Sequence, residues 1–353
     1  MNPLTVEDLE YELPKGCIAT HPVTPRSSAK LLVVKDGLFL HKRVSDLATL
    51  LPENALLVVN ETAVVPARFK TQRVGSGGKG EGLFLKQHGS IWEVMLKTNG
   101  KLRKGVSLQL TGKIQLELDE RVGNNWMCSC NDSRDAREIL QEIGTTPIPP
   151  YIIGARGKTK MNDVEDRERY QTVYADSAQN FSIAAPTAGL HFDEKLLLEL
   201  EEKGIQRIPI TLHVGAGTFK GIQTATIEEH QMHEEYWEVS QESLDAIKAA
   251  KAEGKPVIAI GTTSVRTLES LPCMASWPEK GGLSGATRLM ITPPYDFVLI
   301  DGMLTNFHLP KSTLLTLVAA MIGIDTLKSA YAEAITSGYR FYSYGDAMFF
   351  LSQ

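Results

Sequence analysis

The spacing of hydrophobic residues changes along the chain. Residues 31–34 and 38–40 are hydrophobic runs on either side of Lys35-Asp36-Gly37, a turn sequence that predicts a β-hairpin. Residues 55–60 form a short apolar run that is typical of a buried strand. The first part of the chain therefore predicts strands of a packed sheet.

A different pattern begins near Arg68 and continues to about Cys130. Hydrophobic and polar residues alternate there over short stretches separated by glycine turns, which predicts strands at residues 82–86, 91–97, 106–110, 114–118 and 126–130. Five short strands at this spacing favour a small barrel or sandwich. A helix is predicted over residues 135–143, and the prolines of residues 147–150 mark a boundary. We expect a β-barrel domain, residues 67–147, inserted into a domain made of residues 1–66 and 148–353.

Strands and helices alternate after Phe181. Strands are predicted at residues 206–214, 257–260 and 297–300, and helices at residues 194–203, 242–253, 265–270, 314–322 and 327–336. This alternation predicts an α/β body with a mainly parallel sheet.

Composition narrows the class of protein. Of the 353 residues, 42% are hydrophobic and 22% are charged, as in an ordinary globular protein. No apolar run is long enough to cross a bilayer, and the acidic start of the chain lacks the order of a signal peptide. The four cysteines are scattered and fit reduced thiols. We therefore expect a cytoplasmic protein, with no membrane partner, that is a monomer.

The charge is unevenly distributed. The formal net charge is −5, but residues 66–113 carry ten Lys or Arg against only Glu81 and Glu93. Such a basic segment fits contact with nucleic-acid phosphates, and it equally fits a lysine-rich face in solvent.

Two segments match nucleotide-binding motifs, but the residues around them do not have the structure that such motifs require. Gly75-Ser-Gly-Gly-Lys-Gly80 satisfies GxGxxG, but a strand rather than a helix is predicted after it, so we interpret it as a hairpin loop. Lys311-Ser-Thr313 resembles the end of a phosphate-binding loop but lacks the preceding glycines. A nucleoside triphosphatase is therefore not expected.

Polar turns in the second half of the chain carry the candidate chemistry. Gly261-Thr-Thr-Ser-Val-Arg266 joins a predicted strand to a predicted helix, a place where hydroxyls and backbone N–H groups suit a carboxylate, a phosphate or ribose, and where Arg266 can add a clamp. Simple helix capping by Thr263 or Ser264 is the alternative. Residues 305–313 form a similar turn with Asn306, His308 and Lys311. Together with the turns around His191 and His213, they favour one shared pocket.

His230-Gln-Met-His233 suggests a different chemistry. Two imidazoles three residues apart on a helix can share a metal ion, so a metal-dependent hydrolase is one alternative function. The sequence is not HExxH, and no third ligand is identified. A non-catalytic RNA-binding module is a second alternative.

Long strings identify a family. They include Val64-Val-Pro-Ala-Arg68, Tyr170-Gln-Thr-Val-Tyr174, Ala185-Pro-Thr-Ala-Gly-Leu-His-Phe192 and residues 211–219, 261–269, 305–313 and 339–348. On these the chain resembles the S-adenosylmethionine:tRNA ribosyltransferase-isomerase family of queuosine biosynthesis. The resemblance implies an α/β domain with an inserted β-barrel. It also implies an enzyme without a prosthetic group or a metal, for which S-adenosylmethionine is a co-substrate.

The reaction that the resemblance implies transfers and isomerises the ribosyl group of S-adenosylmethionine. The acceptor is 7-aminomethyl-7-deazaguanine at the wobble position of the tRNA anticodon stem-loop, and the products are epoxyqueuosine in tRNA, adenine and methionine. The chain departs from the family pattern at Lys30, Glu61, Ala63 and Pro294 and at residues 220–221. We expect these departures to concern RNA contacts more than the reaction.

Roles for individual residues complete the prediction. We expect His191, His213 and His308 to transfer protons, and Thr262, Thr263, Ser264 and Arg266 to hold the ribose and the methionyl carboxylate. Further candidates for substrate binding are Thr187, His230, His233, Asn306, Lys311, Arg340, Ser343 and Asp346, although residues 339–343 fit a packed terminal strand equally well. Arg26, Arg68, Lys101, Arg103 and Lys104 are expected to contact RNA phosphates.

Overall fold

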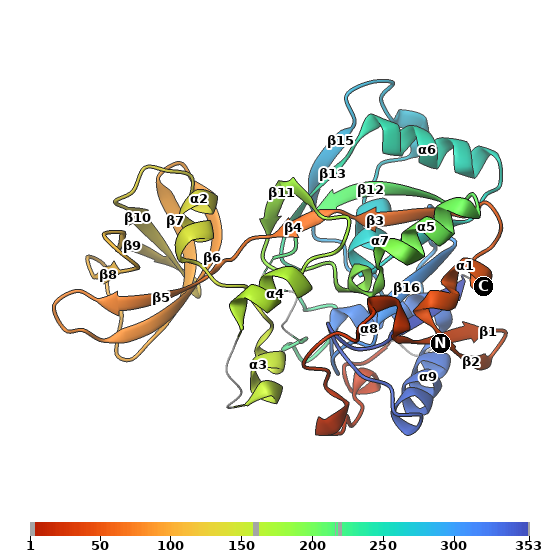
Figure 1. Cartoon of the computed structure of the whole chain (residues 1–353), viewed down its shortest axis with the longest axis horizontal. Coiled ribbons are helices and arrows are strands. Elements are labelled where there is room, and N and C mark those ends of the chain that lie inside the picture. The colour runs from red at the N-terminus through yellow and green to blue at the C-terminus, as the bar shows by residue number, and fades with distance from the viewer. Residues whose placement is uncertain (1–3, 158–161, 216, 218–220, 352–353) are drawn as a thin grey trace.

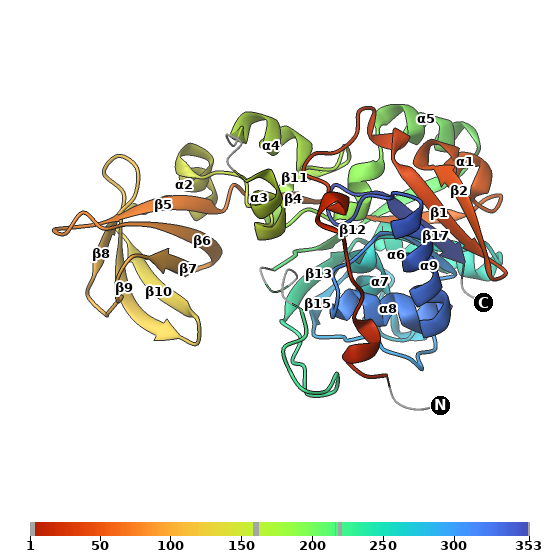
Figure 2. The ribbon, with the colours of Figure 1, turned by 90° about the horizontal axis from the view of Figure 1, so that it is seen from below.

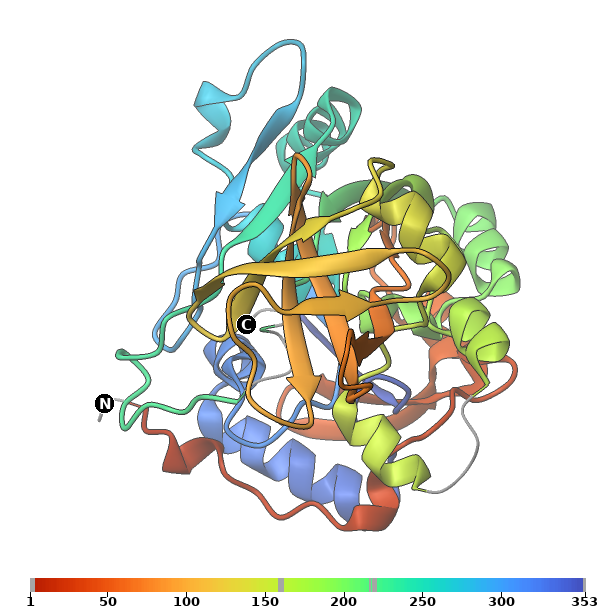
Figure 3. The same ribbon diagram turned by 90° about the vertical axis from the view of Figure 1, so that its left-hand side faces the viewer.

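The structure has two bodies, a strand-rich barrel at one end and a large sheet with helices at the other (Figure 1). The barrel corresponds to the region of short alternating strands, and the sheet with helices corresponds to the rest of the chain. The structure is a computed structural model, and it describes residues 4–157, 162–215, 217 and 221–351. Figures 2 and 3 show the same two bodies from below and from the barrel end.

Within these residues, the large sheet has nine strands in the order β15-β13-β12-β3-β14-β16-β17-β1-β2. Their bounds in chain order are β1 (Lys30–Lys35), β2 (Leu38–Arg43), β3 (Leu56–Asn60), β12 (Gln206–Leu212), β13 (Glu235–Val239), β14 (Val257–Ile260), β15 (Leu283–Thr287), β16 (Gly302–Asn306) and β17 (Ala347–Leu351). The predicted hairpin is confirmed as β1 and β2, whose turn residues Asp36 and Gly37 both have positive φ.

The α/β class is confirmed, but the expectation of a mainly parallel sheet is wrong. The central strands β12, β3, β14 and β16 are parallel, as is the pair β17 and β1. The remaining neighbours are antiparallel: β13 and β15 extend one edge, β17 runs opposite to β16, and β2 pairs with β1 at the other edge. The sheet is therefore mixed, with its parallel part at the centre.

Both faces of the central strands are buried. Leu57 and Val59 of β3 pack on one face, while Leu56 and Val58 pack on the other. The α-helices among the described residues are α1 (Leu47–Leu50), α2 (Ala136–Ile143), α3 (Pro150–Arg156), α4 (Asp163–Arg169), α5 (Glu194–Glu202), α6 (Gln241–Ala252), α7 (Thr262–Leu268), α8 (Thr313–Ile322) and α9 (Ile324–Thr336). Residues of α1 and α5 belong to one core, and residues of α6, α7, α8 and α9 to the other. This two-sided burial explains the continuous apolar runs of the central strands.

The inserted segment forms a closed antiparallel barrel, in the order β10-β7-β6-β5-β8-β9. Its strands are β5 (Arg68–Arg73), β6 (Lys79–His88), β7 (Ile91–Thr98), β8 (Ser107–Gln109), β9 (Gln115–Val122) and β10 (Asn125–Cys130). The prediction of a small barrel is confirmed, and the glycine-rich segment at residues 75–80 lies at the β5–β6 hairpin. The sequence missed β5, because only Phe69 and Thr71 of that polar strand point inward. The domain boundaries at residues 66/67 and 147/148 stay predictions.

Two crossing segments connect the barrel to the body. Backbone hydrogen bonds join Arg68 and Thr145 in both directions, at 3.1 and 2.7 Å. Beside them, a Cβ placed on Gly144 would lie 1.9 Å from the Pro66 carbonyl oxygen. Glycine therefore permits the close approach of the two connections. A short two-stranded sheet of β4 (Thr62–Val64) and β11 (Asp176–Ser182) lies next to them, and Ile183 reaches into the barrel core.

The predicted strand at residues 297–300 is wrong. The backbone N–H groups of Val298, Leu299 and Ile300 donate to the carboxylate of Glu269 at 3.0, 3.0 and 3.3 Å, and this takes the place of strand pairing. The strand of this region is β16, which begins at Gly302. Within the described part of the chain, no single helix has the length and apolarity needed to span a membrane; α8 and α9 would reach that length only together, and they meet at a bend of 111°.

Candidate functional site

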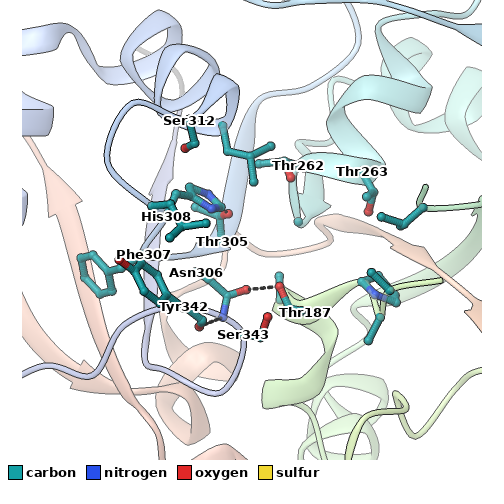
Figure 4. A pocket seen from close by; sticks show the side chains of 18 of the residues that line it. Thr187, Thr262, Thr263, Thr305, Asn306, Phe307, His308, Ser312, Tyr342 and Ser343 are labelled. Carbon is teal, nitrogen blue, oxygen red and sulfur yellow. Dashed lines mark hydrogen bonds between the residues drawn. The ribbon is translucent and has the colours of Figure 1, made fainter. Parts of the chain in front are cut away.

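The main pocket lies where β14 and β16 end, next to the 3-10 helix Thr187–His191 (Figure 4). Its cavity volume is about 70 Å³, which is below the usual range for a small-molecule site, so a larger ligand would extend beyond it. Its wall combines the hydroxyls and amides of Thr187, Thr262, Thr263, Thr305, Asn306, Ser312 and Ser343 with the rings of Tyr151, Phe307 and Tyr342. None of its described lining residues is Asp, Glu, Lys or Arg. A neutral pocket with aromatic and hydroxyl groups suits a nucleoside.

Asn306 is held in one orientation. Its side-chain oxygen accepts a hydrogen bond from the Thr187 hydroxyl at 2.9 Å, and its amide nitrogen donates to the Tyr342 carbonyl at 3.1 Å. The structure thus brings together Thr187 and Asn306, two of the predicted binding residues, from segments that lie 119 residues apart in the chain.

His308 faces the same pocket from a buried position. Its Nε2 lies 2.9 Å from the Thr305 hydroxyl oxygen, and its backbone N–H donates to the Tyr331 hydroxyl at 2.8 Å. Burial lowers the pKa of His308 to about 3, because the charged ring would lose its hydration. The ring is therefore neutral near pH 7, and it is better suited to hydrogen bonding with a substrate than to storing a proton.

A second pocket adjoins the first and shares Thr262, Thr263 and Leu314 with it. Its charged groups are Arg266 and Glu235, whose side chains are 7% and 5% exposed and form a salt bridge. The Nε of Arg266 donates to the Leu289 carbonyl at 3.1 Å, and the backbone N–H of Gly215 donates to Glu235 at 3.1 Å. Nη2 of Arg266 is buried and has no hydrogen-bond partner among the described residues. That nitrogen is available to an anionic ligand group.

His230 and His233 also line the second pocket. They lie in a loop rather than on the helix that the metal interpretation assumed, so the helical spacing does not apply. Burial and the neighbouring His233 both lower the pKa of His230. Among the described residues, no group of three or more His, Cys, Asp or Glu side chains is placed to hold a metal ion. The third ligand that the hydrolase alternative requires is therefore still not identified.

Of the seven residues predicted to transfer protons or to hold the ribose and the carboxylate, three lie outside both pockets. The Ser264 hydroxyl donates to the Ile260 carbonyl at 2.9 Å, inside α7. The buried His191 ring has Nδ1 2.9 Å from the Ala188 carbonyl oxygen and Nε2 3.0 Å from that of Gly345. His213 Nδ1 lies 2.9 Å from the Thr62 hydroxyl oxygen, whereas the next residue, Val214, lines the main pocket. Proton transfer by His191 and His213 and substrate binding by Ser264 stay predictions. The geometry does not favour them, because the three side chains do not line either pocket.

The alternative interpretation, helix capping by Thr263 or Ser264, is wrong. The helix begins at Thr262, one turn earlier than expected, and no side-chain hydrogen bond caps it. Gly261, with a φ of 89°, makes the turn from β14 and leaves Thr262 and Thr263 at the pocket wall. The early start explains why Ser264 points into its own helix.

The remaining substrate-binding candidates divide between the pocket and the scaffold. The Ser343 hydroxyl lies 2.5 Å from that of Tyr151, and both residues line the main pocket. Asp346 is 2% exposed and accepts hydrogen bonds from the backbone of Lys30 and Arg340 and from the Arg340 guanidinium. Lys311 forms a salt bridge with Glu10 at 3.0 Å. Asp346, Arg340 and Lys311 therefore hold chain segments together.

The predicted RNA contacts also differ among themselves. Arg26 donates to the carbonyls of Gln171, Glu168 and Arg169, and Arg68 donates to the Ile148 carbonyl. Burial lowers the pKa of both guanidiniums. Lys101, Arg103 and Lys104, in contrast, are exposed on the barrel between β7 and β8. Of the five predicted RNA contacts, these three offer open charge to a phosphate backbone.

Sequence reasoning missed Glu235, Ser312 and Tyr342. Glu235 begins β13, whose alternating burial places it inward, so an acidic residue at an inward strand position was the available signal. The Ser312 hydroxyl is buried without a partner among the described residues and lines the main pocket, next to the Lys311 on which the prediction rested. The φ of 73° at Tyr342 has no sequence signal. Residues 216 and 218–220 of the predicted loops lie outside the described residues.

Comparisons with known proteins bear on this site. The chain matches the family model described as queuosine biosynthesis protein over residues 6–350. It is 41% identical over 353 residues to the S-adenosylmethionine:tRNA ribosyltransferase-isomerase of Desulfitobacterium hafniense, covering 99% of this chain and 100% of that protein. Identity to the protein of the same name from Moorella thermoacetica is 43% over 355 residues, with 99% and 100% covered. The crystal structure of an S-adenosylmethionine tRNA ribosyltransferase from Thermotoga maritima is similar with a TM-score of 0.54 and 31% identity, covering 98% of this chain and 100% of that one.

Proposed function

This chain belongs to the queuosine biosynthesis protein family, and from that membership we propose that it is an S-adenosylmethionine:tRNA ribosyltransferase-isomerase. The family resemblance found in the sequence is confirmed. The proposed reaction moves the ribosyl group of S-adenosylmethionine to 7-aminomethyl-7-deazaguanine at the wobble position of tRNA. It yields epoxyqueuosine in tRNA, adenine and methionine.

The observation that supports this function most is the pair of adjoining pockets. The neutral pocket of Thr187, Asn306 and His308 suits the adenosine part of the substrate. The second pocket presents the partnerless Nη2 of Arg266 to a carboxylate, and Glu235 lies beside it for an ammonium group. Thr262 and Thr263 line both pockets, where the ribose and the sulfonium would lie. A nucleoside joined to an amino acid matches this two-part shape.

The chemistry assigns limited roles to these residues. The sulfonium acidifies the C5′ hydrogens, so a base can remove one proton. Adenine then leaves from C1′ and takes up a proton, and the acceptor amine forms a bond to a ribosyl carbon and loses a proton. The C5′–S bond breaks with its electron pair going to sulfur, which releases methionine. The neutral His308 and the hydroxyls of Thr305 and Ser312 are placed to hydrogen-bond the sugar or the base as charge develops. The geometry does not assign the group that removes the C5′ proton.

One assay tests the proposal. Purified protein should release adenine only when both S-adenosylmethionine and tRNA carrying 7-aminomethyl-7-deazaguanine are present. Adenine release without tRNA, or none with both substrates, would contradict it. A metal-dependent hydrolase would instead lose activity with a chelator, and an RNA-binding module would bind the tRNA without releasing adenine. The proposed tRNA substrate also leads us to expect the protein in the cytoplasm. The monomeric state stays a prediction, which light scattering can test.

A further inference from the structure

Four side chains from four separate elements form a row outside both pockets. The Arg137 guanidinium, from α2 of the inserted segment, lies 4.3 Å from the ring centroid of Phe181 on β11. The Phe181 ring lies 5.0 Å from the ring of His213, which follows β12. The His213 ring is in turn stacked with Tyr236 on β13, at 6.2 Å and within 15° of parallel. We name Phe181, His213 and Tyr236 the aromatic row.

Two of the three rings of the aromatic row are open to solvent, and the ring of His213 is half-buried between them. Phe181 and Tyr236 are each 47% exposed, although large aromatic side chains are usually buried in a core. Burial along β13 alternates, with Glu235 and Trp237 inward and Tyr236 outward. His213 and Tyr236 face each other across the β12–β13 pairing, since the His213 N–H donates to the Tyr236 carbonyl at 3.0 Å. Both rings therefore lie on the outward face of this sheet edge.

The row is adjacent to the proposed reaction site. His213 precedes Val214, which lines the main pocket, and Tyr236 follows Glu235, which lines the second pocket. Phe181 lies three residues before Ala184, another residue of the main pocket. The same strand ends thus carry the pockets on one face and the aromatic row on the other.

We propose that the aromatic row is a stacking platform for an unpaired nucleobase of the substrate RNA, next to the nucleotide that enters the pocket. Exposed aromatic planes stack bases of single-stranded RNA irrespective of sequence. The proposal rests on the proposed function, because that function brings an RNA loop to this edge. It gives His213 a binding role in place of proton transfer.

The charges around the row favour stacking over phosphate contact. Glu238 lies on the same outward face of β13 as Tyr236, and Glu61 lies close to Glu238 and Asp176, with Arg207 as the cation near it. These three carboxylates outnumber that arginine, so the charge disfavours a phosphate more than an uncharged base. Burial lowers the pKa of His213 to about 4, so its ring is neutral near pH 7, and the Thr62 hydroxyl holds its orientation. Arg137 is the cation that contacts the row, and its side chain pairs with Asp135.

The test uses an anticodon stem-loop with 2-aminopurine, a fluorescent base, placed on either side of the wobble position. Binding to the wild-type protein should quench the fluorescence at one of these positions. Tyr236→Leu and Phe181→Leu remove a ring but keep an apolar side chain, and each should reduce the quenching and weaken binding about 10-fold. Tyr236→Phe, which keeps the ring, should restore both. Tyr295→Leu is the matched control, because Tyr295 lies outside the row and both pockets.

Salt dependence separates stacking from charge. The two Leu variants should lower affinity at every salt concentration without changing the slope of log K against log salt, since every bond to a phosphate is kept. Unaltered quenching and affinity in both variants, or an equal loss in Tyr295→Leu, would overturn the platform. The platform would also be overturned if the Leu variants bound RNA as the wild type does but lost binding to a protein partner.

Failure of the platform and failure of the proposed function give different results. If the wild-type protein releases adenine from both substrates and the KM for RNA is the same in Tyr236→Leu, the platform alone is wrong. If the wild-type protein quenches the probe but releases no adenine, the proposed function is wrong and the platform stands as an RNA site. Thermal melts of each variant establish that the protein is folded.

Discussion

The guanidinium of Arg266 donates to the carboxylate of Glu235, and both residues of this buried salt bridge line the second pocket. The pair joins α7 to the first residue of β13, so it connects the turn after β14 with the edge of the sheet. One terminal nitrogen of this guanidinium is partnered and the other has no partner among the described residues, so we propose that Arg266 has a structural role and also binds the substrate carboxylate.

Replacing Arg266 with Lys should separate these two roles. Lys keeps the charge beside Glu235 but lacks the planar second nitrogen, so it cannot hold a carboxylate in the same way. We expect the KM for S-adenosylmethionine to rise at least about tenfold, a loss of about 1.4 kcal/mol, measured by adenine release at saturating tRNA. Arg288→Lys is the matched control, because Arg288 is 70% exposed and pairs with Glu234 at the surface. Equal KM values in the two variants would argue against a carboxylate at Arg266.

The buried His308 predicts a dependence of stability on pH. In the folded protein its pKa is about 3, whereas in the unfolded chain it returns to about 6.5. The unfolded state therefore takes up a proton as the pH falls below about 6.5, and the folded state does not. The stabilisation is complete above pH 6.5 and is lost progressively as the pH falls toward 3.

The measurement compares the wild type with His308→Gln. Denaturant titrations between pH 7 and 4.5 should show the free energy of unfolding of the wild type falling more steeply, by about 1.4 kcal/mol per pH unit below pH 6. His21→Gln, at an exposed position, should behave as the wild type does. Parallel pH profiles for wild type and His308→Gln would show that the ring is not buried in its neutral form.

Local patterns were sufficient to predict much of the fold. The hairpin of β1 and β2 follows from Asp36-Gly37. The predicted helices over residues 135–143 and 194–203 begin within one residue of α2 and α5, which Asp135 and Asp193 cap. Turn and capping chemistry depends on residues that are close in sequence, so it can be read directly. The polar strand β5 was missed because its burial depends on closure of the barrel, which the sequence does not show locally.

The site was predictable as a set of turns but not side chain by side chain. The turns of Thr187, Thr262 and Asn306 do meet, as expected from strand ends in an α/β sheet. A shift of one residue along a turn decides which side chain faces the pocket. Val214 lines the pocket, whereas the preceding residue, His213, contacts Thr62 outside it. The inward Glu235 became visible only with the β12–β13 register.

The exposed charges of the barrel should contribute to RNA affinity. Changing Lys101, Arg103 and Lys104 to Glu should weaken binding of the anticodon stem-loop and reduce its salt dependence, by about one unit of slope for each phosphate that the variant no longer binds. Lys195→Glu is the control, since Lys195 is 85% exposed on α5 of the body. Affinity that is unchanged in the triple variant would mean that the barrel does not contact the RNA.

The two connections to the barrel make Gly144 a sensitive position. An alanine Cβ there would lie 1.9 Å from the Pro66 carbonyl oxygen and 2.5 Å from that of Leu140, and both are backbone atoms that cannot rotate away. We expect Gly144→Ala to lower the free energy of unfolding by about 2 kcal/mol, because the connections must separate and the Arg68–Thr145 hydrogen bonds weaken.

Gly154→Ala provides the control for that experiment. Gly154 lies in α3, and its Cβ would have no neighbour within 4 Å, so alanine should leave stability unchanged or raise it by up to about 1 kcal/mol. Urea denaturation followed by tryptophan fluorescence suits the measurement, because Trp92 and Trp126 report on the barrel and Trp237 on the sheet. A Gly144→Ala protein as stable as Gly154→Ala would show that the two connections can move apart without cost, and the barrel would then not be held against the body by this crossing.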